Sequence, residues 1–215
     1  MIVSFIYPAI ILLISIGMHE YAHAFSSYKL GDPTPKMQDR LSPNPIKHLD
    51  PIGFFLIFLI GFGRGKPVQI NPMYYKKPLR DELITALAGP AMNLTLAIAG
   101  MTIMMIYARL MGIDLQTLIM QNFDLVTLFW MMFITINIGL AIFNLIPIFP
   151  LDGYRLVKIF WTKGAVWMEQ HAMMISVVLL VFLLGPGKGI VGNYIIMVTS
   201  KLYDVFFMIG SQIFY

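Results

Sequence analysis

The chain has 215 residues, of which 58% are hydrophobic and only 12% are charged, and its mean hydropathy is +0.76. A soluble domain carries about 25% charged residues, so this composition excludes an ordinary soluble fold. The formal net charge is +4, and the absence of cysteine excludes both a disulfide framework and a thiolate metal site.

The basic residues are concentrated in particular segments of the chain. Nine lysines and arginines lie between Lys29 and Arg80, and a smaller group follows at Arg155, Lys158 and Lys163. By the positive-inside rule both segments face the cytoplasm, which predicts a multi-pass protein of the plasma membrane with its N-terminus outside. These charges lack the interleaved aromatic residues of a strand-binding surface, so we expect a lipid bilayer and no nucleic acid as a partner.

The first apolar run, from about Val3 to Lys29, predicts a retained transmembrane helix. It has neither the basic start nor the small-residue cleavage site of a secretory signal peptide. Glycine and prolines from Gly31 onward end this helix. The next apolar stretch, Ile52–Phe62, is too short to cross about 30 Å of hydrocarbon and predicts a re-entrant loop. Val68–Ile70, between two prolines, predicts a short strand.

Four further apolar runs are each long enough to span a membrane. They extend from about Leu79 to Met111, Asp124 to Leu145, Val166 to Leu184 and Ile190 to Phe214. The sequence therefore predicts an all-α polytopic membrane protein with about five transmembrane helices, plus a re-entrant loop and a small β-sheet element at the cytoplasmic side. We expect one membrane-embedded domain over residues 1–215, with a catalytic core at about 3–160 and a C-terminal helix pair at about 166–214.

Three ionisable residues form a compact motif inside the first predicted helix. His19, Glu20 and His23 have the H-E-x-x-H spacing, in which two histidines one turn apart can bind one zinc ion and the glutamate serves as general base. Ionisable groups within a membrane helix are costly and usually functional. A polar contact in the bundle and a chance match are the alternative interpretations.

Catalytic zinc keeps three protein ligands and one open position for water, so a third ligand is required. We expect Asp152, because Pro147 and Pro150 break the helix before it and free backbone groups that are tolerated only against protein or a wet cavity. The rival candidates for the third ligand are His48, Glu82 and Glu169. Of these, Glu82 suits the positive end of a helix dipole instead, and Glu169 resembles a surface residue at a helix end.

At these residues the sequence resembles the site-2 protease family of intramembrane zinc metalloproteases. The resemblance covers roughly Ile14 to Lys158 and implies one zinc ion per chain, held by His19, His23 and Asp152. It further implies Glu20 as general base and membrane-spanning protein segments as substrates. The motifs that carry it are His19–His23, Ser42–Gly53, Gly65–Val68, Gly89–Asn93 and Asn144–Gly153.

The sequence also departs from the family pattern. Its histidine motif lies in the first span, without the additional preceding helices of some members, and we expect neither a PDZ nor a CBS domain. Phe149 and Tyr154 replace the proline and glycine expected at those positions. Neither replacement removes an expected ligand.

Asn93 follows Pro90 by one helical turn and has two interpretations. Its amide could satisfy a backbone group that the proline leaves unpaired. Alternatively it could donate to the substrate or to the oxyanion formed during attack, which would make it catalytic. The resemblance favours the second role.

Two other functions remain open on the residues alone. A cation transporter could use the same histidines, but transport sites are usually repeated along a path, whereas this chain has one cluster and no internal repeat. A structural membrane protein could be held together by a metal, but such a site is closed by four protein ligands. The sequence leaves the oligomeric state and the identity of the substrate undetermined.

Overall fold

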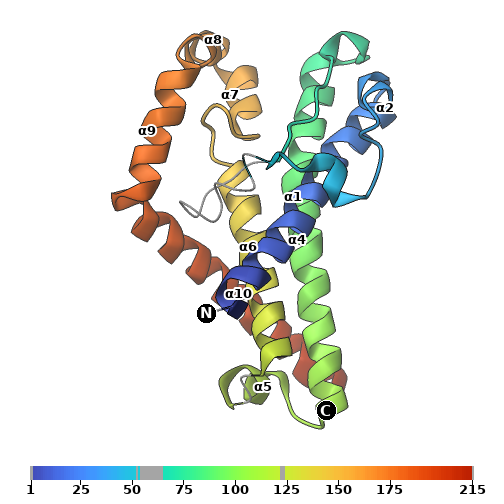
Figure 1. Cartoon of the computed structure of the whole chain (residues 1–215), viewed down its shortest axis with the longest axis vertical. Coiled ribbons are helices and arrows are strands. Elements are labelled where there is room, and N and C mark those ends of the chain that lie inside the picture. The colour runs from blue at the N-terminus through green and yellow to red at the C-terminus, as the bar shows by residue number, and fades with distance from the viewer. Residues whose placement is uncertain (1, 52, 54–64, 122–123, 215) are drawn as a thin grey trace.

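A computed structural model of the chain describes residues 2–51, 53, 65–121 and 124–214. These residues are mostly helical, which confirms the all-α prediction (Figure 1). The long helices are α1 (Ile2–Lys29), α4 (Pro78–Met111), α6 (Leu125–Asn144) and α10 (Pro186–Phe214). The shorter helices are α2 (Thr34–Met37), η1 (Pro45–His48), η2 (Pro72–Tyr74), α5 (Leu115–Gln121), α7 (Tyr154–Phe160), α8 (Thr162–Gln170) and α9 (Ala172–Leu184).

Four of the described helices, α1, α4, α6 and α10, are long and apolar enough to cross a membrane. The run predicted from Val166 to Leu184 is broken rather than straight, because α8 and α9 meet at an angle of 84°. If this bent pair is counted as one span, the described helices provide up to five membrane spans. The break lies at His171, whose ring nitrogen Nδ1 bonds the carbonyl oxygen of Trp167 at 2.8 Å and so satisfies an acceptor at the end of α8.

Helices α1, α4 and α6 form the central bundle, and two different regions lie along it (Figure 1). The half nearer α5 is an apolar core in which methionine, leucine and isoleucine side chains of α4, α5 and α6 are buried, with α10 packed against them. The other half carries buried polar side chains, including His19, His23 and Asn93. Buried polar groups require partners, so this end of the bundle is the candidate site.

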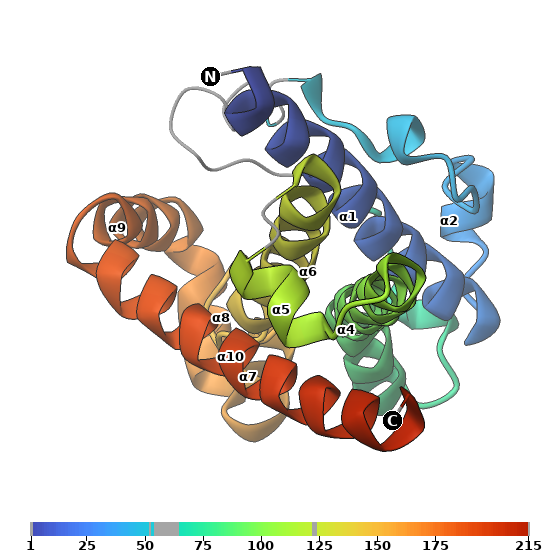
Figure 2. The same ribbon diagram turned by 90° about the horizontal axis from the view of Figure 1, so that it is seen from below.

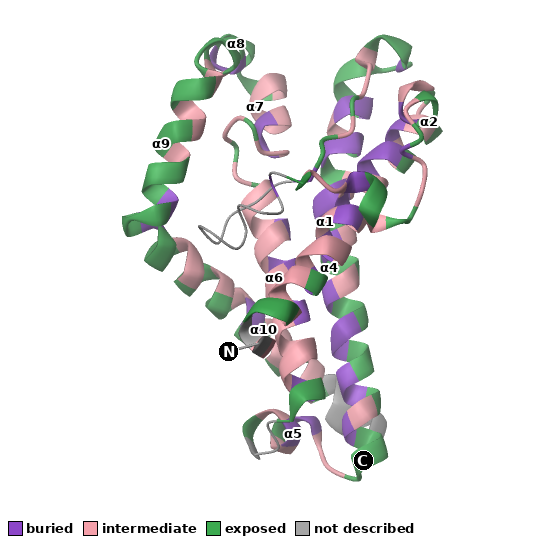
Figure 3. Cartoon of the chain, in the orientation of Figure 1, coloured by how far each residue is buried: buried purple, intermediate pink, exposed green. Residues whose placement is uncertain are grey.

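The C-terminal helices form an arm beside the bundle. Helix α9 packs on α8 and α10, and α10 then returns to contact α6, α4 and α5 (Figures 1 and 2). Most of α9 is exposed, including Val177, Val181 and Leu184 (Figure 3). Exposed apolar side chains all round a helix are expected where lipid rather than water is the solvent.

The predicted β-sheet element is wrong for the part of the chain that the structure describes. Residues 66–71 form no strand, and the described pairing is a single antiparallel bridge between Leu49 and Gly65. The amide of Val68 donates to the Glu20 carboxylate at 3.1 Å rather than to another strand. A strand requires a partner along its length, which the local pattern of residues could not reveal. The predicted re-entrant stretch, Ile52–Phe62, lies outside the described residues except for Gly53.

Candidate metal centre

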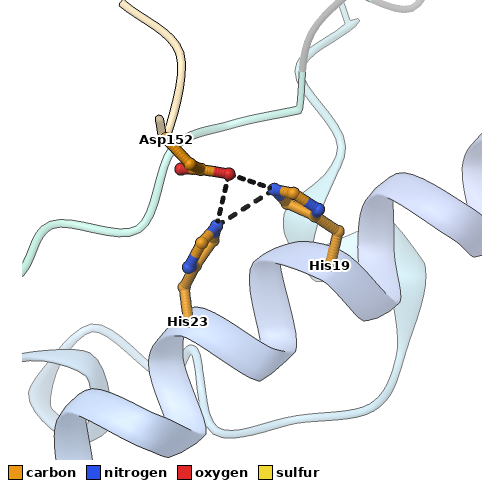
Figure 4. Close-up of side chains that lie close together, drawn as sticks. All are labelled: His19, His23 and Asp152. Atoms are coloured by element: carbon orange, nitrogen blue, oxygen red, sulfur yellow. Dashed lines mark hydrogen bonds and ion pairs between the residues drawn. The ribbon is translucent and has the colours of Figure 1, made fainter. Parts of the chain in front are cut away.

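Helix α1 presents His19 and His23 on one face, one turn apart, and both rings point toward Asp152 (Figure 4). Both side chains are buried, and their Nε2 atoms lie 3.0 Å apart. The i, i+4 spacing predicted this arrangement, because 3.6 residues per turn bring such positions together.

The third group comes from a loop far along the sequence. Asp152 extends toward both rings (Figure 4), and its Oδ2 atom lies 3.1 Å from Nε2 of His19 and 3.3 Å from Nε2 of His23. The loop folds back on the end of α6, where the Gly153 amide donates to the Asn144 carbonyl at 2.6 Å. A Cβ on Gly153 would lie 2.3 Å from the Leu145 carbonyl oxygen, so glycine permits this close approach.

The hydrogen bonds of the two rings determine which nitrogen carries the proton. His19 donates from Nδ1 to Oδ1 of Asn93 at 2.6 Å, and His23 donates from Nδ1 to the backbone oxygen of Thr85 at 2.7 Å. Both oxygens are pure acceptors in these bonds, so the protons must lie on the Nδ1 atoms. The Nε2 atoms of the neutral rings then point lone pairs at the space between the three side chains, which is how metal-binding histidines are usually oriented.

This arrangement fits a zinc ion. The Oδ2 atom of Asp152 is buried and receives no hydrogen bond from the described residues, so three acceptors converge without a donor between them. Tetrahedral zinc with bonds of about 2.0–2.1 Å holds its ligand atoms roughly 3.3 Å apart. The observed separations of 3.0, 3.1 and 3.3 Å are close to that value.

Asp152 is in the charged form that a metal ligand requires. Burial alone would raise the pKa of its carboxyl group. Without a metal, however, the facing rings of His23 and His19 can take up a second proton, and that positive charge holds the pKa of Asp152 well below its usual range. Asp152 is therefore a carboxylate at neutral pH.

Gly89 of α4 provides the space in which the three groups meet. A Cβ at this position would lie 2.4 Å from Nε2 of His23 and 2.6 Å from Nε2 of His19. These distances are shorter than any non-bonded contact, so only glycine lets α4 approach the two metal-facing nitrogens this closely.

A cavity of about 340 Å³ opens beside the three side chains. Glu20 lines it together with Val68, whose amide holds the Glu20 carboxylate at 3.1 Å. The remaining wall is mainly apolar, with Thr85, Asn144 and Arg155 as its polar members. Glu20 thus lies in the same cavity as the metal-facing groups without belonging to their cluster, which is the position expected of a general base.

The comparisons with known proteins agree with this geometry. Residues 7–185 match Peptidase_M50, described as peptidase family M50. The chain belongs to this family. It is an intramembrane zinc metalloprotease with several membrane-spanning helices.

Two relatives of this M50 peptidase are named "Putative zinc metalloprotease". YwhC of Bacillus subtilis (strain 168) is 38% identical over 183 residues, which cover 83% of this chain and 82% of the relative. Rip2 of Mycolicibacterium smegmatis is 34% identical over 92 residues, 40% of this chain and 35% of the relative. Stage IV sporulation protein FB of B. subtilis is 25% identical over 117 residues, 54% of this chain and 34% of the relative. No solved structure gave a significant match.

The rival ligands lie elsewhere in the M50 peptidase. His48 is buried at the end of η1, where Nε2 donates to the Ser42 carbonyl at 2.8 Å and burial lowers the pKa of the ring. Glu169 is exposed and accepts a hydrogen bond from Tyr154 at 2.6 Å. Glu82 is paired with two cations of α7. Within the described part of the chain, the candidate metal cluster is His19, His23 and Asp152.

Asn93 is fully buried, and both of its amide hydrogens and one of the two acceptor positions of its Oδ1 atom are used. Its Oδ1 atom accepts from His19, and its Nδ2 atom donates to Oδ1 of Asn137 at 3.0 Å and to the Ser15 carbonyl at 3.3 Å. The predicted bond to a substrate or oxyanion would require one of these contacts to be released. The observed contacts favour a positioning role for Asn93, in which it orients the His19 ring.

A second network supports the His23 ring and was not predicted from the sequence. The Tyr75 hydroxyl bridges Thr85 at 3.1 Å and Ser27 at 2.8 Å, and Ser27 donates to the buried Asp32 at 2.9 Å. Burial alone would raise the pKa of Asp32, but hydrogen bonds from Thr34, Asn71 and Ser27 hold it below its usual value. The Asp32 carboxylate thus connects residues 71–75, through Ser27 and Tyr75, to the part of α4 that bonds His23. No short-range pattern marks these partners, because they are up to 48 residues apart.

Proposed function

We propose that His19, His23 and Asp152 hold the catalytic zinc of this peptidase and that Glu20 is its general base. The observation that carries the proposal is the convergence of two lone-pair nitrogens and one buried carboxylate oxygen on a single point, 3.0 to 3.3 Å from one another. Three protein ligands leave the fourth position of a tetrahedral ion available, as in catalytic rather than structural zinc sites.

The residues around the cavity have separate tasks in peptide hydrolysis. Zinc bound between the three ligands supplies a Lewis acid, which acidifies water and polarises a carbonyl group. Glu20 accepts the proton of the attacking water and passes it to the departing amine nitrogen. The Val68 amide holds the Glu20 carboxylate in position for both transfers. Asn93 and the Thr85 carbonyl keep the two imidazole rings in the orientation that binding requires.

The substrate is a transmembrane segment of another protein, bound with its backbone extended. A helical substrate keeps its carbonyl groups in its own hydrogen bonds, so it must unwind near the cleavage site. Residues 66–71 run along the cavity, and Pro67, Val68 and Ile70 line it. This segment forms no strand with another described part of the chain. Because Pro67 has no amide hydrogen and the Val68 amide is bonded to Glu20, an extended substrate would pair by strand addition through the other backbone groups of this segment.

The placement in the membrane follows from charge. The basic residues between Lys29 and Arg80 favour the cytoplasmic side of the plasma membrane, which puts the N-terminus outside and the cavity near the cytoplasm. In this arrangement residues 3–160 are the catalytic core, and the C-terminal pair at about 166–214 forms the arm beside it.

Metal removal tests the proposed function. Purified peptidase treated with a strong zinc chelator is expected to lose cleavage of a reconstituted transmembrane peptide, because no other described group replaces the ion. Zinc at one equivalent per chain should restore activity, whereas magnesium and calcium should not, since they prefer sites built from oxygen ligands. Full activity in metal-free protein would exclude the proposed mechanism.

A further inference from the structure

We infer that Glu82 is a positioning residue that fixes the Asp152 loop against α4. This inference rests on the proposed function, in which Asp152 is a zinc ligand. Glu82 lies in the first turns of α4 and is buried, with 4% of its surface exposed. A buried carboxylate needs charged or hydrogen-bonding partners, and here both are cations of another helix.

The two cations belong to α7, which begins two residues after Asp152. Arg155 donates from Nη1 to Oε1 of Glu82, and Lys158 donates from Nζ to both carboxylate oxygens at 3.0 and 3.1 Å. Arg155 and Lys158 are three residues apart and so lie on the same face of α7. One carboxylate therefore holds the start of α7, and with it the preceding loop, against α4.

The position of Glu82 on α4 connects this contact to the metal centre. Glu82, Thr85, Gly89 and Asn93 are buried and are separated by three, four and four residues, which places them on one stripe of the helix. Thr85 bonds the His23 ring, Asn93 bonds the His19 ring, and Gly89 leaves room between them. Glu82 adds the contact to the segment that supplies the third group. One face of one helix thus aligns all three candidate ligands.

Loss of the Glu82 charge would also create a competitor for Asp152. Arg155 lines the same cavity as Asp152, and without Glu82 its guanidinium group would lack its carboxylate partner. An unpaired cation in a partly buried cavity is drawn to the remaining carboxylates that line it, which are those of Glu20 and Asp152. Arg155 and the metal would then compete for the carboxylate of Asp152.

The test is zinc affinity of the full chain in detergent, measured by chelator competition, for Glu82→Gln and a matched control, Asp81→Asn. Asp81 is also buried, but among the described residues its side chain bonds its own segment, through Arg80 and the Lys77 amide. Glu82→Gln is expected to lower zinc affinity roughly 10–100-fold, the usual effect of losing an outer-shell partner. Asp81→Asn should keep the wild-type affinity.

Two further measurements separate positioning from general stability. Thermal unfolding of the metal-free proteins records any loss of fold, and excess zinc should restore most of the cleavage rate of Glu82→Gln, because all three ligands remain. Lys158→Met, which keeps the Arg155 pair, should give a smaller loss of affinity and covers the case in which Glu82→Gln does not fold. Wild-type zinc affinity in both variants would overturn the inference.

Asp152→Ala, assayed in parallel, distinguishes failure of this inference from failure of the proposed function. If Asp152→Ala binds zinc as tightly as the wild type, the ligand assignment fails and the role of Glu82 fails with it. If Asp152→Ala loses zinc and Glu82→Gln retains it fully, only the positioning role of Glu82 is excluded.

Discussion

Replacement of Glu20 by glutamine is expected to leave zinc bound and to lower the cleavage rate by about 10²–10⁴-fold, the range for loss of a general acid–base group. Glu20 is outside the His19, His23 and Asp152 cluster, so the ligand set stays intact. Glutamine has the same shape and keeps an oxygen that can accept from the Val68 amide. It cannot accept the proton of water. The measurement pairs zinc content per chain with the cleavage rate of a reconstituted transmembrane peptide.

The same variant separates the peptidase from the other functions considered for this sequence. Retained zinc with lost cleavage supports the peptidase. Metal flux across a vesicle membrane that persists in Glu20→Gln, with no cleavage by either protein, would indicate a transporter. Unchanged behaviour of the variant in every assay would indicate a metal that only stabilises the bundle. Comparison of membrane proteomes with wild-type and Glu20→Gln peptidase would then identify substrates as precursors that accumulate in the variant.

Gly89→Ala is expected to abolish high-affinity zinc binding, with a loss larger than the 10–100-fold typical of changes around the ligands. Its new methyl group would lie 2.4 Å from Nε2 of His23 and 2.6 Å from Nε2 of His19. Relief requires the rings to turn away or α4 to separate from α1, and either change disperses the ligands. At other positions within a helix, replacing glycine by alanine stabilises the folded protein by about 0.5–1 kcal/mol, whereas at Gly89 we expect the replacement to be harmful.

Gly100→Ala is the matched control on the same helix. A Cβ at Gly100 would meet side-chain atoms of Ile134 and Phe133 at 3.1 and 3.2 Å, in the apolar half of the bundle. Those side chains can shift by a few tenths of an ångström, so zinc affinity should remain at the wild-type value. Tight zinc binding by Gly89→Ala would mean that the observed approach of α4 to the histidines is not required.

The membrane helices and two of the three residues of the candidate metal centre were predictable from the sequence because both depend on local periodicity. Long apolar runs define spans, and the spacing of His19 and His23 places them on one helix face. Asp152 was predicted less directly, from the helix-breaking prolines before it and from the family resemblance. The structure brings it to within 3.3 Å of both rings.

Other features depend on tertiary contacts that no local pattern encodes. The carbonyl of Thr85 holds His23, but every residue has a carbonyl, so its use here leaves no mark in the sequence. Helices α8 and α9 form a bent pair, although hydropathy alone suggested one span. The short strand at Val68–Ile70 was wrong because strand formation depends on a partner. The hydrogen-bond partners of the Asn93 amide were likewise not predictable. Its Nδ2 atom donates to Ser15 and Asn137, which come from two other helices.

The ligand role of Asp152 is tested most directly by X-ray absorption at the zinc edge of the Asp152→Cys variant. The chain has no cysteine of its own, so any sulfur coordination other than from methionine must come from the new residue. We predict one sulfur neighbour at about 2.3 Å, in addition to nitrogen at about 2.0–2.1 Å from the two histidines. Zinc that is bound with the wild-type affinity and only nitrogen and oxygen neighbours in this variant would contradict the proposed centre.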